Sequence, residues 1–127
     1  MADALIVDDS KVMREMVIAC LRGLPGLAFA QAASGLEAIE RLSLSSYRAM
    51  VLDLNMPDIG GFEVIEFVRC QVKLKDLPIL VVTTRDDEAS KVRAVQAGAS
   101  AFMTKPFGPE AILDAVRRLL EDREARE

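Results

Sequence analysis

The stretch "MVLDLNMPD", residues 50–58, joins an apolar run to an aspartate and then to a proline-containing turn. A short apolar run of this kind, bounded by turn residues, is typical of a strand that is buried on both faces. Asp53 interrupts the run near its end, and Pro57 with Asp58 favours a turn just after it. A buried carboxylate is costly unless it has a partner, so Asp53 is the first candidate functional residue.

The rest of the chain repeats this arrangement. Apolar runs typical of strands occupy residues 4–7, 27–33, 49–54, 78–84 and 101–104, and a segment with apolar residues at helical spacing follows each of them. Five strands that alternate with five helices predict an α/β fold with a parallel sheet covered by helices on both faces. The apolar stripes predicted for the first four helices include Val12, Met16, Cys20, Leu36, Val72, Val92 and Val95, and Cys70 lies within the third helical pattern.

Composition indicates one folded domain without a broad basic surface. The chain has 127 residues, of which 51% are hydrophobic and 28% are charged, with a formal net charge of -4. This balance is typical of a globular protein, and the acidic charge argues against a general nucleic-acid or anionic-membrane surface. We predict a domain over residues 1–123 and a charged tail over 124–127, which either extends a helix or begins a linker.

Cysteine and histidine usage narrows the chemistry. Cys20 and Cys70 have neither metal-site nor redox-pair spacing, so both are predicted to be reduced thiols in the core. The chain has no histidine, so an imidazole needed for phosphoryl transfer must come from a partner. No leader-like or membrane-spanning segment is evident, which favours a cytoplasmic protein without membrane insertion.

Polar residues stand at four of the predicted strand ends: Asp8 and Asp9, Asp53, Thr83, and Lys105 before a proline. Each has an ordinary explanation when taken alone. Asp9 could cap a helix, Asp53 could bind turn amides, Thr83 could be a β-branched strand residue, and Lys105 could be a surface lysine. The carboxyl ends of parallel strands share one edge of the sheet, however, and ligands bind at that edge. The four ends together therefore predict a site.

The charges of this predicted site call for a cation. If Asp8, Asp9 and Asp53 converge, each close pair repels by about 4 kcal/mol at ~4 Å in an effective dielectric near 20. Lys105 offsets one negative charge, and a divalent cation would offset the other two. Carboxylate oxygens suit Mg²⁺, whereas zinc would need histidine or paired cysteines. With a metal held by the adjacent Asp8 and Asp9, Asp53 could act as a nucleophile and form an aspartyl phosphate.

Four segments resemble one known family. "VDDSKVMR", "LDLNMPDIGGFE", "VVTT" and "TKPF" occur in this order and spacing in the receiver domain of bacterial two-component response regulators. The chain is most similar to the single-domain, CheY-like chemotaxis regulators, from about Leu5 to Leu120. The resemblance implies a flavodoxin-like doubly wound (βα)5 fold, with five parallel strands in the order 2-1-3-4-5 and a receiver domain over residues 1–123.

The resemblance also assigns roles at the acidic strand ends. Asp53 would be the phosphoacceptor. Mg²⁺ would be held by the carboxylates of Asp8, Asp9 and Asp53 and by the backbone carbonyl of Asn55. Arg85, like Asn55, matches a variable position that tunes the lifetime of the phosphoryl group in this family.

Further roles fall on the last two strands. Thr83 and Lys105 would bind phosphoryl oxygens, and the peptide bond between Lys105 and Pro106 would be cis. Thr83 and Phe102 would form the switch, because Phe102 matches the aromatic position whose rotamer reports phosphorylation. Motility regulators often have tyrosine there, so a partner contact that needs the hydroxyl is in question.

The implied function is a signalling switch and not an enzyme beyond its own phosphorylation and slow dephosphorylation. A histidine kinase or phosphotransfer protein would phosphorylate Asp53. The phosphoryl group would then shift the face built from the fourth helix, the strand at 101–104 and the last helix, altering the binding of a downstream protein. We expect a monomer or a phosphorylation-dependent dimer, with no direct contact to nucleic acid.

Several alternatives remain open at this level. A phosphatase of the haloacid dehalogenase kind would need a second aspartate where Asn55 stands, and a flavodoxin would not place two carboxylates beside the flavin phosphate. A receiver-shaped module that is never phosphorylated is a third possibility. A stand-alone chemotaxis regulator is favoured over a receiver excised from a transcription factor, a second-messenger enzyme or a hybrid kinase.

Overall fold

The computed structural model describes residues 3–126 and shows five strands alternating with five helices. The elements in chain order are β1 (Ala4–Val7), α1 (Lys11–Leu21), β2 (Phe29–Ala32), α2 (Gly35–Leu44), β3 (Ala49–Leu52), α3 (Gly61–Cys70), β4 (Ile79–Thr83), α4 (Glu88–Ala97), β5 (Ala101–Thr104) and α5 (Pro109–Arg126). The first and last strands match the predicted residues, whereas β2 is three residues shorter than its predicted run and β3 and β4 are each two residues shorter.

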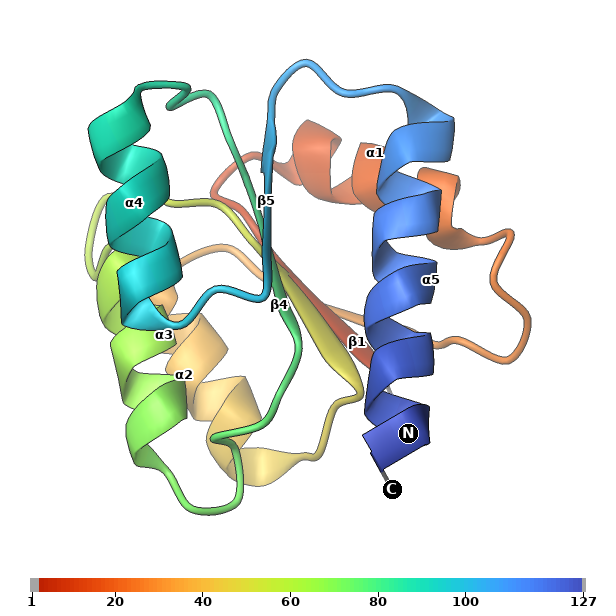
Figure 1. Ribbon diagram of the computed structural model, residues 1–127, viewed down its shortest axis with the longest axis horizontal. Helices are drawn as coiled ribbons and strands as arrows, with labels where there is room; N and C mark the ends of the chain where they lie inside the picture. Colours follow the sequence, from red (N-terminus) through yellow and green to blue (C-terminus); the bar gives the residue numbers. More distant parts are fainter. Residues whose placement is uncertain (1–2, 127) are drawn as a thin grey trace.

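The strands form one parallel sheet in the order β2-β1-β3-β4-β5. Helices α1 and α5 cover one face of the sheet, and α2, α3 and α4 cover the other (Figure 1). The predicted flavodoxin-like architecture and strand order are therefore confirmed. Because β3 lies between β1 and β4, any residue that follows β3 lies at the centre of the carboxyl edge of the sheet.

Alternate residues of the central strands serve two separate cores. In β3, Met50 and Leu52 pack towards α2, α3 and α4, while Ala49 and Val51 pack towards α1 and α5. Every residue of β1, β3 and β4 is buried, which explains why these strands are apolar except for Thr83 at the end of β4, instead of alternating with polar residues. This burial fixes the strand ends, and hence the site, in a rigid frame.

Polar caps start three helices at defined residues. The Ser10 hydroxyl accepts a hydrogen bond from the Met13 N–H at the start of α1. The Ser34 hydroxyl and the Asp87 carboxylate do the same for α2 and α4. Each cap satisfies a backbone donor that the first helical turn leaves free, so the loops at the carboxyl edge end at specified positions.

The predicted apolar stripes were wrong at several exposed positions. Val12 is 70% exposed, Met16 47% and Leu36 58%, because α1 buries Val17, Ile18 and Leu21, and α2 buries Ala38 and Leu42. The predicted third helix was too long: α3 ends at Cys70, and Gln71 has an extended backbone, which leaves Val72 85% exposed. Both cysteines are free, but Cys20 is only partly buried and Cys70 is exposed, so the prediction of two core thiols was wrong for Cys70.

The last turns of α5 contact the start of β3. An Arg48 guanidinium nitrogen lies 3.0 Å from a Glu124 carboxylate oxygen, and Arg123 donates a 2.8 Å hydrogen bond to the Tyr47 carbonyl. Residues 124–126 of the predicted charged tail continue α5, and Glu127 lies outside the described residues. No helix in residues 3–126 has the length and apolar character needed to cross a bilayer.

Gly61 brings the first turn of α3 into close contact with the end of β3. A Cβ at this position would lie 2.6 Å from the Asp53 carbonyl oxygen and 2.7 Å from the Leu54 Cα, both of which are backbone atoms. We expect Gly61→Ala to lower the free energy of unfolding by about 2–3 kcal/mol, because rigid backbone must shift to make room. Urea unfolding measures this change. Gly108→Ala is the control, since nothing lies within 4 Å of its Cβ, and equal stability of the two variants would contradict the prediction.

Candidate functional site

Four of the predicted site residues meet at the carboxyl edge of the sheet. Asp8 follows β1, Asp53 follows β3, Thr83 ends β4, and Lys105 follows β5. Asp8 and Asp53 are each 5% exposed, and Thr83 is fully buried. The Asp53 N–H donates to the Val7 carbonyl, so the pairing of β3 with β1 continues up to the carboxylate itself. The sheet therefore brings these side chains together as predicted from the strand ends.

Three carboxylates form an acidic cluster. One oxygen from each of Asp8, Asp9 and Asp53 lies within 4.8 Å of the others. Asp8 is oriented by the Ser10 N–H, which donates to its Oδ1 at 2.9 Å, whereas Asp9 is exposed to solvent. Two buried carboxylates and one exposed carboxylate therefore surround a small volume that solvent reaches from the side of Asp9.

Lys105 provides the positive charge of this cluster. Its ammonium nitrogen lies 2.7 Å from Asp8 Oδ2 and 3.5 Å from Asp53 Oδ2, and its side chain is only 11% exposed. The backbone of Lys105 is held by a hydrogen bond from its N–H to the Thr83 carbonyl, and the bond to Pro106 is cis. One ammonium group thus bridges the two buried carboxylates.

The protonation of Asp53 reflects both burial and its neighbours. Desolvation raises the pKa of Asp53 above its ordinary value, and the nearby Asp8 charge acts in the same direction. The Lys105 ammonium, the Asn55 N–H and the Thr83 hydroxyl lower the pKa but do not outweigh burial. The positive charge and hydrogen-bond donors around Asp53 therefore do not fully offset the cost of burying its negative charge. A bound cation would stabilise the charged carboxylate.

The donor set fits a hard divalent cation. All three clustered side chains offer carboxylate oxygens, and their charge of -3 exceeds the single positive charge of Lys105 by two. Asn55 is held beside them, because its N–H donates to Asp53 Oδ1 at 3.3 Å. Oxygen donors with two uncompensated negative charges suit Mg²⁺ and not a soft metal. Asp8, Asp9, Asp53 and the Asn55 carbonyl are the residues that could hold it.

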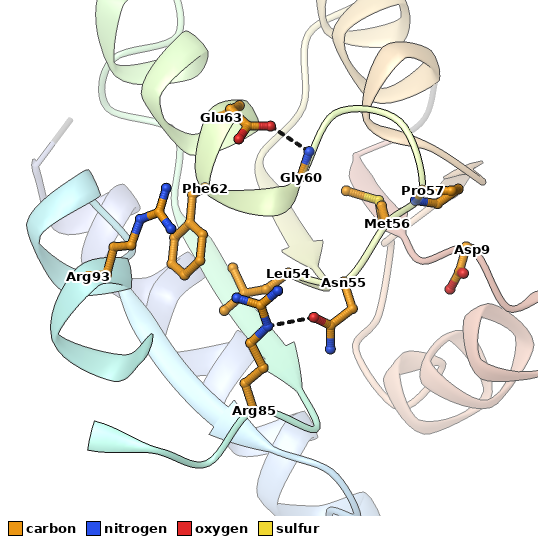
Figure 2. Close-up of a pocket in the computed structure, with 10 residues that line it drawn as sticks. All are labelled: Asp9, Leu54, Asn55, Met56, Pro57, Gly60, Phe62, Glu63, Arg85 and Arg93. Carbon is orange, nitrogen blue, oxygen red and sulfur yellow. Dashed lines mark hydrogen bonds between the residues drawn. The ribbon is translucent and has the colours of Figure 1, made fainter. Parts of the chain in front are cut away.

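The side chain of Asn55 links the loop after β3 to the end of β4. Its Nδ2 donates to the hydroxyls of Thr83, at 3.5 Å, and Thr84, at 3.3 Å. Its Oδ1 accepts a 2.5 Å hydrogen bond from the Nε of Arg85 (Figure 2). The sequence analysis named Asn55 for its backbone carbonyl and Arg85 as a variable position, but it did not predict the hydrogen bond between their side chains. The two residues are 30 positions apart, and a contact over that separation produces no local sequence pattern.

Arg93 and Phe62 are also close to the site, and the sequence did not predict them as a pair. The Arg93 guanidinium carbon lies 4.0 Å from the centroid of the Phe62 ring, and that of Arg85 lies 5.7 Å from it. Both arginines line a cavity of about 460 Å³ that extends to Asn55 and Asp9 (Figure 2). Phe102, the predicted switch residue, lies in β5 and is partly buried against the core below α2, α3 and α4.

Asp58 anchors the other end of the same loop. Its two carboxylate oxygens accept hydrogen bonds of 3.1 Å from the N–H groups of Gly35 and Leu36, the first residues of α2. Partial desolvation tends to raise the pKa of Asp58, but the N–H donors of Leu36, Ile59 and Gly35 outweigh it and hold the pKa below its ordinary value. The sequence analysis treated Asp58 only as a turn residue.

This depressed pKa predicts a pH-dependent contribution to stability. A carboxylate whose pKa falls on folding stabilises the fold at pH values above its unfolded pKa, and the effect disappears as the pH drops through the folded pKa. Asp58→Asn should therefore destabilise the protein at pH 7, and the difference from wild type should shrink below about pH 4. Urea unfolding over this range measures it, with the exposed Asp76→Asn as control. A difference independent of pH would contradict the assignment.

Comparison with known proteins agrees with this geometry. The model of the response regulator receiver domain matches residues 4–117. The chain belongs to that family. It is 32% identical to a chemotaxis protein CheY homolog of Campylobacter jejuni over 117 residues, which cover 91% of this chain and 90% of that protein. It is also 32% identical to the chemotaxis protein CheY of Pseudomonas aeruginosa, over 92% of this chain and 94% of that one.

Solved structures support the same receiver fold. The chemotaxis response regulator CheY4 of Vibrio cholerae is 36% identical and superposes with a TM-score of 0.85, covering 94% of this receiver and 98% of that chain. A CheY-like receiver domain protein of Methanospirillum hungatei has a TM-score of 0.90 over 100% of this chain and 99% of its own, but at 23% identity it supports the fold alone.

Membership of the receiver family confirms the resemblance stated from the four sequence segments. It places the chain among the signalling domains of two-component systems, which are not enzymes in the ordinary sense. The family also typically binds Mg²⁺ in an acidic pocket, and Asp8, Asp9 and Asp53 form an acidic cluster in this chain. The phosphatase and flavodoxin alternatives are therefore set aside.

Proposed function

We propose that this receiver is a phosphorylation-dependent switch that takes a phosphoryl group from a histidine kinase or phosphotransfer protein onto Asp53. The observation that carries the proposal is the bridge formed by Lys105 between Asp8 and Asp53, within a cluster of three carboxylates at the end of the central strand. This arrangement has a nucleophile, a fixed cation and a set of oxygen donors in one place. The partner must supply the phosphohistidine, because the chain has no histidine.

The chain's own residues have distinct roles in this transfer. An Asp53 carboxylate oxygen forms a bond to phosphorus as the bond from phosphorus to the partner's imidazole nitrogen breaks, and the imidazole leaves with the electron pair. Lys105 and the Thr83 hydroxyl are close enough to Asp53 to bind the transferred oxygens. Mg²⁺ held by Asp8, Asp9, Asp53 and the Asn55 carbonyl would neutralise the negative charge that accumulates there.

Phosphorylation would alter the face formed by α4, β5 and α5. The modification changes the charge at Asp53 from about -1 to about -2, which draws Thr83 and Lys105 towards the phosphoryl oxygens. Movement of Thr83 makes room for Phe102, which already lies partly buried on the α4 side of the sheet. A partner that prefers the shifted arrangement gains affinity. In this proposal Asp53 accepts the phosphoryl group, Thr83 moves towards it, and Phe102 responds to the movement of Thr83.

A chemotaxis-type, stand-alone role fits the relatives best. The curated chemotaxis proteins match over 90% to 94% of their own length, so the chain aligns with nearly the whole of each. We propose residues 1–123 as the receiver domain and a cytoplasmic signalling role, with a downstream protein target at the α4–β5–α5 face. The alternative, a receiver that belongs to a larger regulator or hybrid kinase, predicts an output module in the same open reading frame.

A small-molecule phosphodonor tests the proposal without knowledge of the kinase. Incubation with Mg²⁺ and acetyl phosphate should add the mass of one phosphoryl group to the intact chain. Removal of the metal with EDTA should abolish the label, because two negative charges of the cluster are then uncompensated while a dianionic donor approaches. Intact-mass spectrometry measures both results. A label that forms equally well in EDTA would contradict the proposed metal requirement, and no label with Mg²⁺ would contradict the function.

A further inference from the structure

Phe62 lies between the phosphoacceptor site and α4. It occupies the first turn of α3, directly after the loop that begins at Asp53, and its side chain is buried. Arg93 from α4 stacks on its ring at 4.0 Å, and Arg85 from the loop before α4 approaches the same ring at 5.7 Å (Figure 2). Two guanidinium groups from consecutive segments of the chain therefore share one aromatic ring.

Arg85 is also connected to the acceptor carboxylate. Its Nε binds the Asn55 Oδ1, and the Asn55 N–H binds Asp53 Oδ1. Within residues 3–126, neither Arg85 nor Arg93 forms an ion pair with a carboxylate, although Asp87 attracts Arg85 at longer range. Each arginine contributes a cation–π contact, but their like charges repel across the ring. Arg85 therefore contacts both Asn55, which binds Asp53, and the ring on which Arg93 stacks.

Helix α4 is attached more firmly at its end than along its length. Ala94 is its one buried residue, while Val92 is 44% and Val95 57% exposed. At the C-terminal end, Arg69 donates hydrogen bonds of 2.9 and 2.7 Å to the Gly98 carbonyl. The Arg93 contact with Phe62 is thus an important attachment for the middle of the helix, and the Gly98 end is a natural pivot.

We propose that Arg85, Phe62 and Arg93 form a charge-operated latch on α4, which acts through the Phe62 ring and not through Phe102. The latch is connected to Thr83, because the Arg85 N–H donates a 3.3 Å hydrogen bond to the Thr83 hydroxyl. In the unphosphorylated protein the Arg85 guanidinium weakens the stacking of Arg93 on Phe62 by repulsion. A phosphoryl group on Asp53 attracts Arg85 away from the ring, and Arg93 then binds Phe62 more tightly. The phosphoryl trigger rests on the proposed function, whereas the opposition between the two arginines does not.

The latch predicts opposite effects for two substitutions that make the same change of charge. Amide hydrogen exchange across residues 88–97 is measured on the full chain without phosphodonor. Arg93→Gln should speed exchange by about 2- to 5-fold, because an exposed cation–π contact is lost. Arg85→Gln should slow it, because the competing cation is removed while an amide remains to bind Asn55. The double variant should behave like Arg93→Gln alone, since Arg85 acts only through that contact.

Controls separate the latch from general charge effects and from the phosphorylation itself. Lys91→Gln removes a positive charge from the same exposed helix surface and should match wild type. With acetyl phosphate and Mg²⁺, exchange should slow in wild type and in Lys91→Gln, with a smaller change in Arg85→Gln. The latch alone would be overturned if Arg85→Gln and Arg93→Gln changed the exchange rate in the same direction. It would also be overturned if Arg93→Gln exchanged at the same rate as Lys91→Gln. Absence of label on wild-type protein by intact mass would overturn the phosphoryl trigger together with the proposed function.

Discussion

Asp53→Asn is expected to abolish phosphorylation by acetyl phosphate. The amide has nearly the same shape as the carboxylate but lacks the anionic oxygen that attacks phosphorus. The substitution also removes one of the three negative charges that would hold Mg²⁺. Intact-mass spectrometry should find a full label on wild type and none on the variant.

The loss of label in Asp53→Asn is informative only if the variant still folds, and the structure predicts that it does. Burial raises the pKa of Asp53, so its charged form is disfavoured in the fold, and Asp8 repels it. A neutral side chain at this position should leave the metal-free protein at least as stable as wild type, as urea unfolding can measure. Asp76→Asn, an exposed change of the same charge, should label normally. A label of equal extent on Asp53→Asn would place the acceptor elsewhere.

Lys105→Met is expected to lower both the stability of the protein and its rate of labelling. Without metal, the buried carboxylates of Asp8 and Asp53 lose the ammonium that bridges them at 2.7 and 3.5 Å. Removing one partner of a buried ion pair typically costs about 3–5 kcal/mol of unfolding free energy. The rate of labelling should also fall by roughly 10²–10³, because a fixed charge close to the transferred oxygens is gone.

The metal dependence of this variant is the sharper test. A divalent cation can replace the lost charge, so Mg²⁺ should raise the melting temperature of Lys105→Met by more than it raises that of wild type. Thermal unfolding with and without Mg²⁺ measures the two increments. Lys73→Met, at an exposed position, should behave as wild type in stability and labelling. An equal Mg²⁺ increment in both proteins would show that Lys105 and the metal do not share the same carboxylates.

The main architecture was predictable because its signals are local. Strands 4–7 and 101–104 match β1 and β5 residue for residue, since a buried parallel strand is a short apolar run whatever its neighbours are. The polar residues at the ends of β1, β3, β4 and β5 could be grouped at one edge, because all parallel strands end on the same side. The strand order itself came from the resemblance and not from the pattern.

Contacts between distant side chains were not predictable in the same way. The exposure of Val12 and Leu36 depends on which helical face meets the sheet, and an apolar residue on either side of that face fits the same periodicity. Asp58 resembles any turn aspartate until α2 is placed beside it. Arg93 and Phe62 lie 31 positions apart on two helices, and cation–π pairs have no sequence signature.

The distance along the chain between Asp8 and Lys105 bears on how the protein is made. The two residues are 97 positions apart, and β5 is the last strand of the sheet to leave the ribosome. Until then the nascent chain holds its acidic side chains without their lysine, and the edge of β4 is unpaired. Chain synthesis proceeds at about 5–20 residues per second, so this interval lasts for seconds. A nascent receiver therefore completes its site only after all five strands of the sheet have been synthesised, so Asp8 and Asp53 lack their lysine until Lys105 follows β5.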